Sequence, residues 1–452
     1  MKSIQCAVLA LMALACTSHD ALGFAGPDIV LADIPSVLTF GPVNGTWAYI
    51  LGGGTCNNGN QNHEWNSNGS PGLAMNAYRL HNGRLEQIGQ GFPKHACCVV
   101  NGAGCSGMSC SGAGSGLRVG CRDVYSASFN SNQARLGPRS GINAFSGSFS
   151  ILPGGGGDAI FRRLQVAQAD MEPASYPGAL YFVEGVFVGT GDATAANWLN
   201  NATYQRATFN SFQLALVGGA NVGDPAIQAW RDHGNGANMP DLSVQILNVS
   251  VPNEGQFVVG AKARDNGNGT WTYDYAVFNL NSDRSGGSFS VPVPGGATIT
   301  GVGFHDVNYH SGEPYNNSDW VSTVSGAQVS WSSPQTFAQN GNSNALRWGT
   351  MYNFWFTANR GPGQSTATLG LFKPHTPSEV SFAVTGPGVL PCPMDIAPAG
   401  GDGTVNIIDL LVVVAIWGGG GGGAANAADV NGDGTVDIND LLAIVAAWGP
   451  CV

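Results

Sequence analysis

The sequence predicts a mainly β protein in which one or more β-sandwich ectodomains precede a small all-α calcium-binding module. Short stretches between residues 241 and 388 alternate apolar with polar side chains, which is the period of a half-buried strand. The chain holds 67 Gly but is also 43% hydrophobic with 11 Trp, so a turn-rich chain can still fill packed cores. Near residue 388 the alternation ends, and two Asp-rich loops follow, each leading into an apolar run with helical spacing.

The N-terminal residues predict a secretory signal over residues 1–25. One Lys precedes a short apolar run, and the small residues Gly23 and Ala25 follow. The run is too short to span a bilayer, and we find no other segment in the sequence that could cross one. Cys16 follows "ALA" but the residues before it fit a lipoprotein signal poorly. We therefore expect the protein to be secreted or held at the cell surface.

Residues 26–240 are expected to form a Cys-containing β-rich domain, with strand-like runs such as "GALYFVEGVFVG" and "FQLALVGG". An even number of cysteines in an exported chain indicates disulfides. Cys97 and Cys98 should take different partners, because a bond between neighbours strains the peptide. The six early cysteines are expected to pair among themselves: Cys56, Cys97, Cys98, Cys105, Cys110 and Cys121.

Residues 241–388 are expected to form an antiparallel β-sandwich. "GTWTYDYAVFNL" has the two-residue period, and "GSFSVPVP", "GATITGVGF", "AQVSWSS", "LRWGTMYNFWFTA", "ATLGLF" and "EVSFAV" follow at turn-bounded intervals. No helical pattern separates these runs, and strands at this spacing indicate an antiparallel β-sandwich. "GPGVLPCP" then reads as a linker to a module at residues 391–452.

The charge of the chain argues against nucleic-acid binding and points to a cation in the module. The net charge is −11, and no basic cluster is present that could contact a phosphate backbone. From Cys392 onward there are seven Asp and no Glu, Lys or Arg. That much repulsion in a short segment calls for bound cations.

The loop "DVNGDGTVDIND" carries the ligand spacing of a calcium site. Side-chain oxygens fall at loop positions 1, 3, 5, 9 and 12, Thr435 can offer its backbone carbonyl, and Gly434 permits the sharp turn. An Asx-rich turn without metal is the alternative. The predicted side-chain ligands are Asp429, Asn431, Asp433, Asp437 and Asp440.

A second copy of the pattern, "GGDGTVNIIDLL", lies 31 residues earlier. It is less complete, because Pro398 and Gly400 stand at positions 1 and 3; Asp395 could serve as position 1 if "APAGG" bulges out. We therefore expect two Ca²⁺ sites, with the later loop binding more tightly. The predicted ligands of the earlier loop are Asp395, Asp402, Thr404, Asn406 and Asp409.

Each loop leads into a short apolar helix. The sequence places one apolar face on each helix, and we expect the two faces to bury each other because helices of this length are not stable alone. Cys392 precedes the first loop and Cys451 follows the second helix, so a disulfide could clasp the ends of the module. Free tail cysteines or a link between two chains are the alternatives. The predicted faces are Leu410, Leu411, Val414 and Trp417, then Leu441, Leu442, Val445 and Trp448.

The duplicated loop and helix, with "DLL" after each loop, resembles a type I dockerin module. The resemblance implies calcium binding and a cohesin-like or cell-surface protein partner. Cellulosomal dockerins have a Ser-Thr type pair at loop positions 10 and 11, where this chain has Ile407 and Ile408, then Ile438 and Asn439. The basic residues usual in the helices are also missing. The larger part, with stretches such as "LGPRSGIN", is similar to β-rich proteins that bacteria secrete with dockerin-like tails, which implies no particular activity.

Two further groups of residues could carry chemistry. The first, in "FHDVNYHSGEPYNNSDW", could converge on a metal or a sugar, or could simply satisfy a structural loop; its spacing matches no defined metal motif. The second lies near the cysteines and could bind copper or zinc, although disulfides compete for the sulfurs. The first group is His305, Asp306, His310, Glu313, Tyr315 and Asp319; the second is His63, Glu64, His81 and His95.

These observations favour a secreted, calcium-binding protein without catalytic activity, anchored in an extracellular assembly by its tail. A carbohydrate-active enzyme that degrades polysaccharide is one alternative, and a polysaccharide-binding protein is another. No Gly-x-Ser-x-Gly, His-Glu-x-x-His or phosphate loop is present. A buried acidic pair in a cleft would favour the enzyme, and a flat row of exposed Trp would favour polysaccharide binding.

Overall fold

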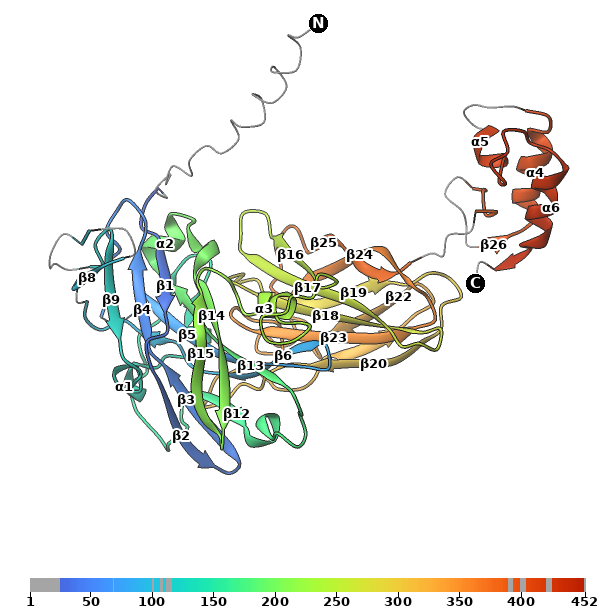
Figure 1. Ribbon diagram of the computed structural model, residues 1–452. Helices are drawn as coiled ribbons and strands as arrows, with labels where there is room; N and C mark the ends of the chain where they lie inside the picture. Colours follow the sequence, from blue (N-terminus) through green and yellow to red (C-terminus); the bar gives the residue numbers. More distant parts are fainter. Residues whose placement is uncertain are drawn as a thin grey trace, which may run out of the picture.

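The computed structural model describes residues 25–67, 69–99, 101–105, 109–110, 116–388, 393–398, 404–419 and 425–450. The chain is mainly β, as predicted, and three short helices lie in the described part of the C-terminal tail (Figure 1). The predicted signal segment lies outside the described residues except for Ala25. Among the described residues, no helix is both long and apolar enough to cross a membrane.

The first β part is built on a nine-stranded sheet with the order β15-β14-β13-β5-β6-β12-β3-β2, and β7 pairs with β5. A four-stranded sheet, β1-β4-β9-β8, packs beside it. The strands of the larger sheet are β2 (Val37–Val43), β3 (Thr46–Leu51), β5 (Gly72–His81), β6 (Arg84–Gln90), β7 (Lys94–His95), β12 (Leu164–Ala167), β13 (Leu180–Val188), β14 (Ala202–Asn210) and β15 (Gln213–Asn221). Those of the smaller sheet are β1 (Ile29–Asp33), β4 (Gly53–Asn57), β8 (Ala103–Gly104) and β9 (Cys121–Tyr125).

Short elements connect these strands. They are α1 (Ala127–Asn130), η1 (Gln133–Arg135), η2 (Arg139–Gly141), β10 (Ile142–Asn143), β11 (Ser148–Phe149), η3 (Gln168–Met171), α2 (Thr190–Thr194), η4 (Trp198–Asn200) and α3 (Gln228–Asp232). The pair β10 and β11 forms a small hairpin of its own.

The second β part is the predicted antiparallel sandwich. One five-stranded sheet has the order β16-β17-β18-β23-β20 and the other β21-β22-β19-β24-β25. Phe257 and Tyr275 of the first sheet pack against Phe289 and Trp331 of the second, because alternate residues of each strand face inward. The strands are β16 (Gln245–Ser250), β17 (Gln256–Asp265), β18 (Trp271–Asn279), β19 (Gly286–Pro292), β20 (Ile299–His305), β21 (Val321–Val324), β22 (Gln328–Ser332), β23 (Met351–Ala358), β24 (Pro362–Leu371) and β25 (Glu379–Pro387).

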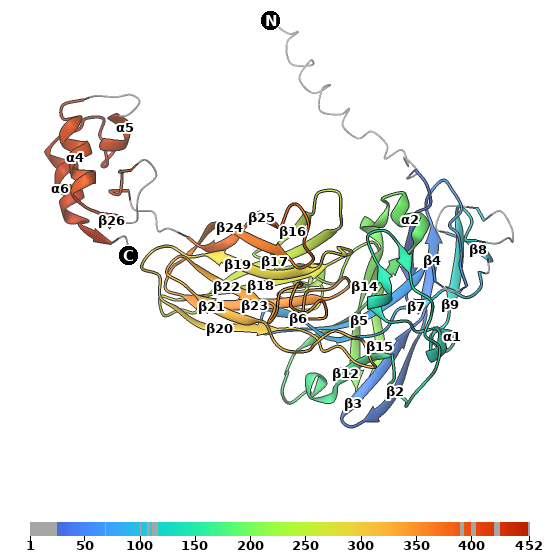
Figure 2. The same cartoon turned by 180° about the vertical axis from the view of Figure 1, so that it is seen from behind.

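The two β parts share a core across residue 240. Strand β6 of the first part lies beside β23 and β18 of the second, as both cartoon views show (Figures 1 and 2). Arg84 Nε donates to Asp274 Oδ1 at 2.7 Å, and the Met351 amide donates to Gln87 Oε1 at 2.7 Å. The boundary at 240 stays a prediction. The shared apolar cluster includes Tyr78, Phe182 and Trp230 on one side and Val258, Phe278 and Met351 on the other.

A buried polar network crosses the same junction. The fully buried Arg139 guanidinium donates to the carbonyls of Gly91 at 3.2 Å, Gly349 at 2.8 Å and Met75 at 3.2 Å. It also donates to Asn76 Oδ1 at 2.7 Å, while Asn76 Nδ2 donates to Glu184 Oε2 at 2.8 Å. Gly349 belongs to the second part and the other acceptors to the first, so one side chain links the two.

The tail comprises β26 (Thr404–Val405), α4 (Ile407–Ala415), α5 (Ala425–Ala428), α6 (Ile438–Ala446) and β27 (Gly449–Pro450). β26 pairs antiparallel with β27, so the two ends of the tail meet. The predicted clasp between Cys392 and Cys451 lies outside the described residues.

The predicted buried faces of the two helices are wrong. The tail core consists of Val405, Val413, Ala428, Val436 and Ile444, with Leu410 and Leu441 packed against it. The runs "LLVVV" and "LLAIV" are apolar almost all round, so spacing alone could not decide which side is buried. Six predicted core residues have exposed fractions between 47% and 56% instead: Leu411, Val414, Trp417, Leu442, Val445 and Trp448.

The prediction for the early cysteines is partly wrong. Cys56 is bonded to Cys105 and Cys110 to Cys121, so four of the six do pair among themselves. Cys97 and Cys98 carry free thiols and contact each other instead of taking separate partners. Pairing could not be deduced from spacing, because connectivity depends on which strands the fold brings together.

Candidate metal centre

The later loop wraps its acidic side chains around its own backbone. Asp429 Oδ1 accepts from the Asp433 amide at 3.1 Å and Asp429 Oδ2 from the Gly434 amide at 2.8 Å. Asp433 Oδ1 accepts from the Thr435 amide at 3.0 Å and from the Thr435 hydroxyl at 2.9 Å, and these two hydrogen bonds lower the pKa of Asp433. Gly434 has a φ of 92°, which only glycine adopts readily, so the turn depends on this residue.

The last two predicted ligands of this loop also start helix α6. Asp437 is the N-cap, and its side chain accepts from the Asn439 amide at 2.7 Å. Asp440 is fully buried and accepts from the amides of Asn431 at 3.2 Å and Asp437 at 2.8 Å. A carboxylate three residues after an N-cap forms a capping box with it. This spacing is visible in the sequence, but the loop pattern predicts only a metal-binding role for both residues.

The earlier loop repeats this arrangement. Asp409 is fully buried and accepts from the amides of Ile396 at 2.7 Å, Ala397 at 2.8 Å and Asn406 at 2.8 Å. Asn406 caps α4 by accepting from the Ile408 amide at 2.7 Å, and its Nδ2 donates to the Thr404 carbonyl at 3.0 Å. Asp395 is half-buried, and Asp402 lies outside the described residues.

The donor set of the later loop fits a hard cation. Its side chains offer only carboxylate and amide oxygens, the ligands that Ca²⁺ prefers. In the described part of the chain, no three His, Cys, Asp or Glu side chains converge closely enough to hold an ion. The loop carboxylates accept from neighbouring amides, and the roles of the predicted ligands stay predictions.

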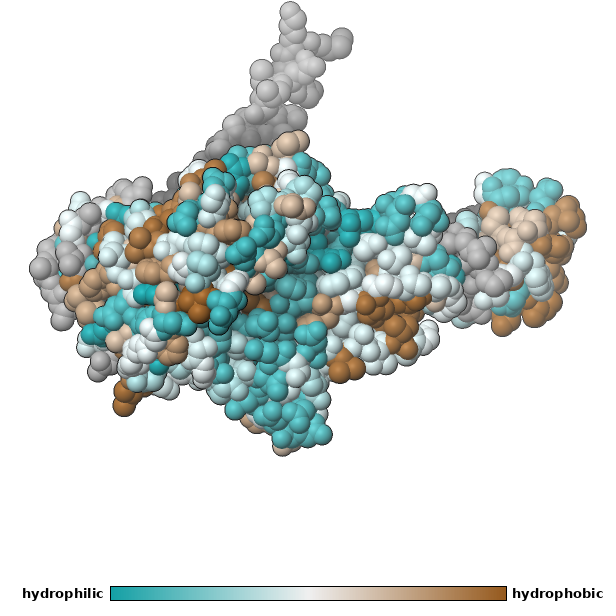
Figure 3. Space-filling view, turned by 90° about the horizontal axis from the view of Figure 1, so that it is seen from below, coloured by the Kyte–Doolittle hydropathy of each residue, from teal (hydrophilic) through white to brown (hydrophobic). Residues whose placement is uncertain are grey.

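The exposed sides of α4 and α6 are apolar and equivalent. Ile407, Leu411 and Val414 on α4, and Trp417 just after it, correspond to Ile438, Leu442 and Val445 on α6, and Trp448 just after it. Every one of the eight is exposed. Figure 3 shows hydrophobic residues gathered over one side of the tail. We call these eight residues the apolar tail face. Large apolar side chains gathered on an exposed surface make the apolar tail face a candidate interaction site.

The family comparison agrees with this geometry. Residues 400–447 match the family model of the Dockerin type I domain. The tail matches the type I dockerin family, which confirms the resemblance inferred from the loops. Type I dockerins in general bind Ca²⁺ and act as docking units of extracellular or cell-surface assemblies.

Comparisons with other proteins do not assign a function to the two β parts. No curated protein matches the chain. A serine-rich repeat adhesion glycoprotein from Streptococcus agalactiae is 12% identical, over 46% of this chain and 70% of its own, with a TM-score of 0.20. The B domain of a biofilm associated protein is 9% identical, over 78% of this chain and 86% of its own, with a TM-score of 0.15. Neither score supports a shared fold.

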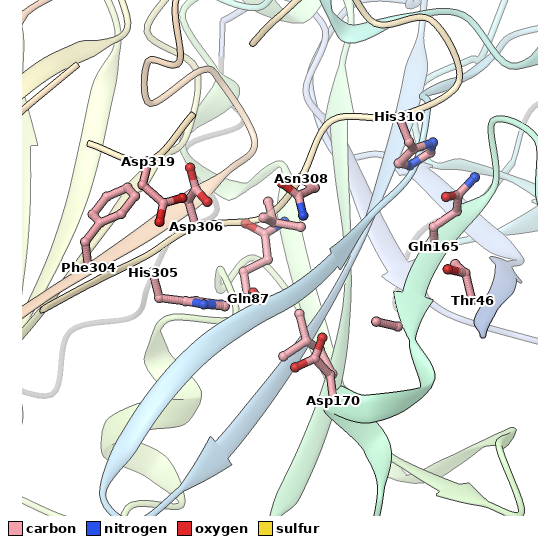
Figure 4. Close-up of a pocket in the computed structure, with 13 residues that line it drawn as sticks. Thr46, Gln87, Gln165, Asp170, Phe304, His305, Asp306, Asn308, His310 and Asp319 are labelled. Atoms are coloured by element: carbon pink, nitrogen blue, oxygen red, sulfur yellow. Dashed lines mark hydrogen bonds between the residues drawn. The ribbon is translucent and has the colours of Figure 1, made fainter. Parts of the chain in front are cut away.

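Four of the six residues of the His305 group, namely His305, Asp306, His310 and Asp319, line a cavity of about 350 Å³ between the two β parts, whereas Tyr315 does not (Figure 4). The two histidines have separate partners. His305 Nε2 contacts the Gln87 carbonyl at 2.9 Å, and His310 Nε2 the Gln90 carbonyl at 2.8 Å. Glu313 lies outside the cavity lining and accepts from the Arg139 amide at 2.8 Å.

Asp306 and Asp319 do lie together at one end of this cavity (Figure 4). Burial raises the pKa of Asp306 to about 6, and Asp319 adds to the rise. Asn344 Nδ2 donates to Asp306 Oδ2 at 2.5 Å, and this hydrogen bond partly offsets the rise in the pKa of Asp306. A metal or catalytic role for this pair stays a hypothesis.

The His63 group is dispersed. His63 is fully buried, and burial lowers its pKa to about 4. His81 packs edge-on against Tyr176 and His95 against Phe149, each through a different ring contact. These histidines therefore do not come together on one metal ion with the cysteines.

Proposed function

We propose that this protein is exported and anchored through its tail to a cohesin-type protein, with the β parts displayed as a binding or structural element. The observation that carries the proposal is the type I dockerin match together with the apolar tail face. The two β parts share a core, so they would be displayed as one body.

The chemistry of the apolar tail face selects the partner. Isoleucines stand at loop positions 10 and 11 of the first repeat, and the helices carry no basic residue. A partner that presents hydrogen-bonding or charged groups here would bury them against isoleucine without a partner, at a cost in free energy. We infer a cohesin-type domain whose contact surface is itself apolar, with binding driven by burial of Leu411, Trp417 and their α6 counterparts.

Binding of the calcium-loaded chain to a panel of cohesin domains, measured by calorimetry, tests this proposal. The double variant Leu411→Asp with Leu442→Asp is expected to bind at least about 30-fold more weakly, because it places a charge in both copies of the face. Each single variant should bind more tightly than the double variant, since it places a charge on only one of the two helices. Leu242→Asp, which changes an exposed leucine of the β part, is the control and should bind normally. Equal binding by the double variant, or no binding to any cohesin domain, would contradict the proposal.

We also propose that the tail holds two Ca²⁺ ions, with the later loop binding more tightly. Its ligand ladder is complete, whereas the earlier loop has Pro398 and Gly400 at positions 1 and 3. Calorimetric titration of the calcium-free full chain should give two sites that differ by about tenfold or more in affinity. Asp433→Ala should remove the tighter site and Asp402→Ala the weaker one. A single site whose affinity is unchanged by Asp433→Ala would contradict this proposal.

The binding alternative has less support than anchoring. The described Trp residues of the β parts are all buried or half-buried, and the exposed ones are Trp417 and Trp448 in the tail. A row of stacking platforms for polysaccharide is therefore not present on the described β surface. The enzyme alternative would rest on the cavity that contains Asp306 and Asp319.

A further inference from the structure

Two adjacent cysteines differ from the other cysteines that the structure describes. Cys97 and Cys98 are free, with their Sγ atoms 3.4 Å apart, whereas the other four early cysteines form two disulfides. Cys98 is exposed and Cys97 half-buried. A reagent in solution can therefore reach the pair, and each sulfur already contacts the other.

The neighbouring strand fixes the backbone of this pair. Tyr125, at the end of β9, accepts a hydrogen bond from the Cys98 amide at 3.1 Å, and its hydroxyl donates to the Cys98 carbonyl. Trp65 Nε1 donates to the Tyr125 hydroxyl at 2.9 Å. The dithiol is therefore held in place by the sheet.

A buried lysine interacts electrostatically with the two cysteines. Lys94 is buried, and its Nζ lies 5.0 Å from the ring centroids of both Tyr125 and Phe129. Burial lowers the pKa of Lys94 to about 8, while the charges of Cys97 and Cys98 oppose this shift. The Cys98 thiol donates to Cys97 Sγ, and this hydrogen bond, together with burial, raises the pKa of Cys98. Cys98 therefore holds its proton, and Cys97 is left as the attacking sulfur.

We propose that Cys97 and Cys98 are a redox-active dithiol that exchanges with external disulfides. The Cys97 thiolate attacks one sulfur of a molecule R–S–S–R, forms a mixed disulfide and releases one R–S⁻. Cys98 then loses its proton, and its sulfur attacks Cys97 Sγ to release the second R–S⁻. The external disulfide gains two electrons and becomes two thiols, and the protein gains one disulfide between neighbouring residues.

Covalent geometry makes this bond reversible. Adjacent Cα atoms are about 3.8 Å apart, which is below the usual range of about 4.4–6.8 Å for disulfides. The Cα atoms are 5.8 Å apart for Cys56 and Cys105 and 4.5 Å apart for Cys110 and Cys121, both within that range. A strained, exposed disulfide is reduced more easily than an unstrained, buried one. The pair should therefore open while the two structural disulfides stay closed.

Graded thiol–disulfide buffers applied to the folded, full-length exported chain test this proposal. After alkylation with iodoacetamide, tryptic peptides are mapped by mass spectrometry. In oxidising buffer we expect Cys97 linked to Cys98; in mildly reducing buffer we expect both to be alkylated while Cys56, Cys105, Cys110 and Cys121 remain bonded. A link from either residue to another cysteine, two free thiols in every buffer, or opening only together with the other disulfides would overturn the proposal.

Phenylarsine oxide, which bridges two adjacent thiols, gives a second readout. The reduced wild-type chain should retain one arsenical. Cys97→Ser and Cys98→Ser should each lose retention but still react once with iodoacetamide, which shows that the remaining thiol is accessible. Retention by either single variant, or none by the reduced wild type, would also overturn the proposal. Because the buffer titration uses only the wild type, the test does not depend on the folding of a variant.

Discussion

Arg139→Met is expected to lower the free energy of unfolding of the β parts by about 3–5 kcal/mol, the usual cost of removing one member of a buried polar network. The guanidinium is fully buried and supplies donors to Gly91, Met75, Asn76 and Gly349. Methionine fills much of the same volume but donates no hydrogen bond, so buried acceptors lose a partner at a cost of about 1–3 kcal/mol each. Denaturant unfolding followed by far-ultraviolet circular dichroism measures the change.

Arg347→Met is the matched control for this prediction. Arg347 is also buried, but it donates to Gly341 and Ser343, which lie six and four residues away in its own loop. Its loss should loosen one loop and cost less than the loss of Arg139, which joins the two β parts. Equal unfolding midpoints for Arg139→Met and the wild type would show that the network contributes nothing measurable to the junction.

The strands of the sandwich could be predicted because their signal is local. "GTWTYDYAVFNL" alternates along its length and becomes β18, whose alternate residues face the core. The network around Arg139 could not be predicted, because its acceptors Gly91 and Gly349 lie 48 and 210 residues away in the sequence. A lone Glu184 within "LYFVEGVFV" was a local sign of a buried polar partner, but nothing in the sequence named that partner.

The tail shows a second reason why the sequence pattern could not predict the whole structure. Spacing located both loops and both helices, since Asx residues and glycines recur at fixed offsets. It did not identify the buried side, because Leu410 and Leu411 are identical in type and differ only in direction. The deciding contact is tertiary: Val413 and Ile444 meet in the core, which turns Leu411 and Leu442 outward. An error in the predicted face thus concealed the candidate docking surface.

Removal of calcium from the full chain is expected to unfold the tail and leave the β parts folded. The tail holds seven Asp and no basic residue, so without a cation its carboxylates repel one another. Its core has five fully buried residues, and α4 and α6 are nine residues each, shorter than the roughly 12–15 residues at which isolated helices become marginally stable. Bound ions would offset the repulsion and draw the loops together, and their binding free energy would become folding free energy.

Hydrogen–deuterium exchange of the full chain with and without chelator measures this loss region by region. Peptides that cover α4 and α6 should lose protection by about two orders of magnitude or more, since a few kcal/mol of binding free energy disappears. Peptides from β17 and β18 are the internal control and should not change, because their hydrogen bonds lie in a sandwich that contains none of the predicted calcium ligands. The exchange is measured in the presence of a reductant, because a disulfide between Cys392 and Cys451 would hold the ends of the calcium-free tail together. Unchanged protection of both helices in chelator and reductant would mean that the apolar core alone folds the tail, and that its seven Asp are tolerated without metal.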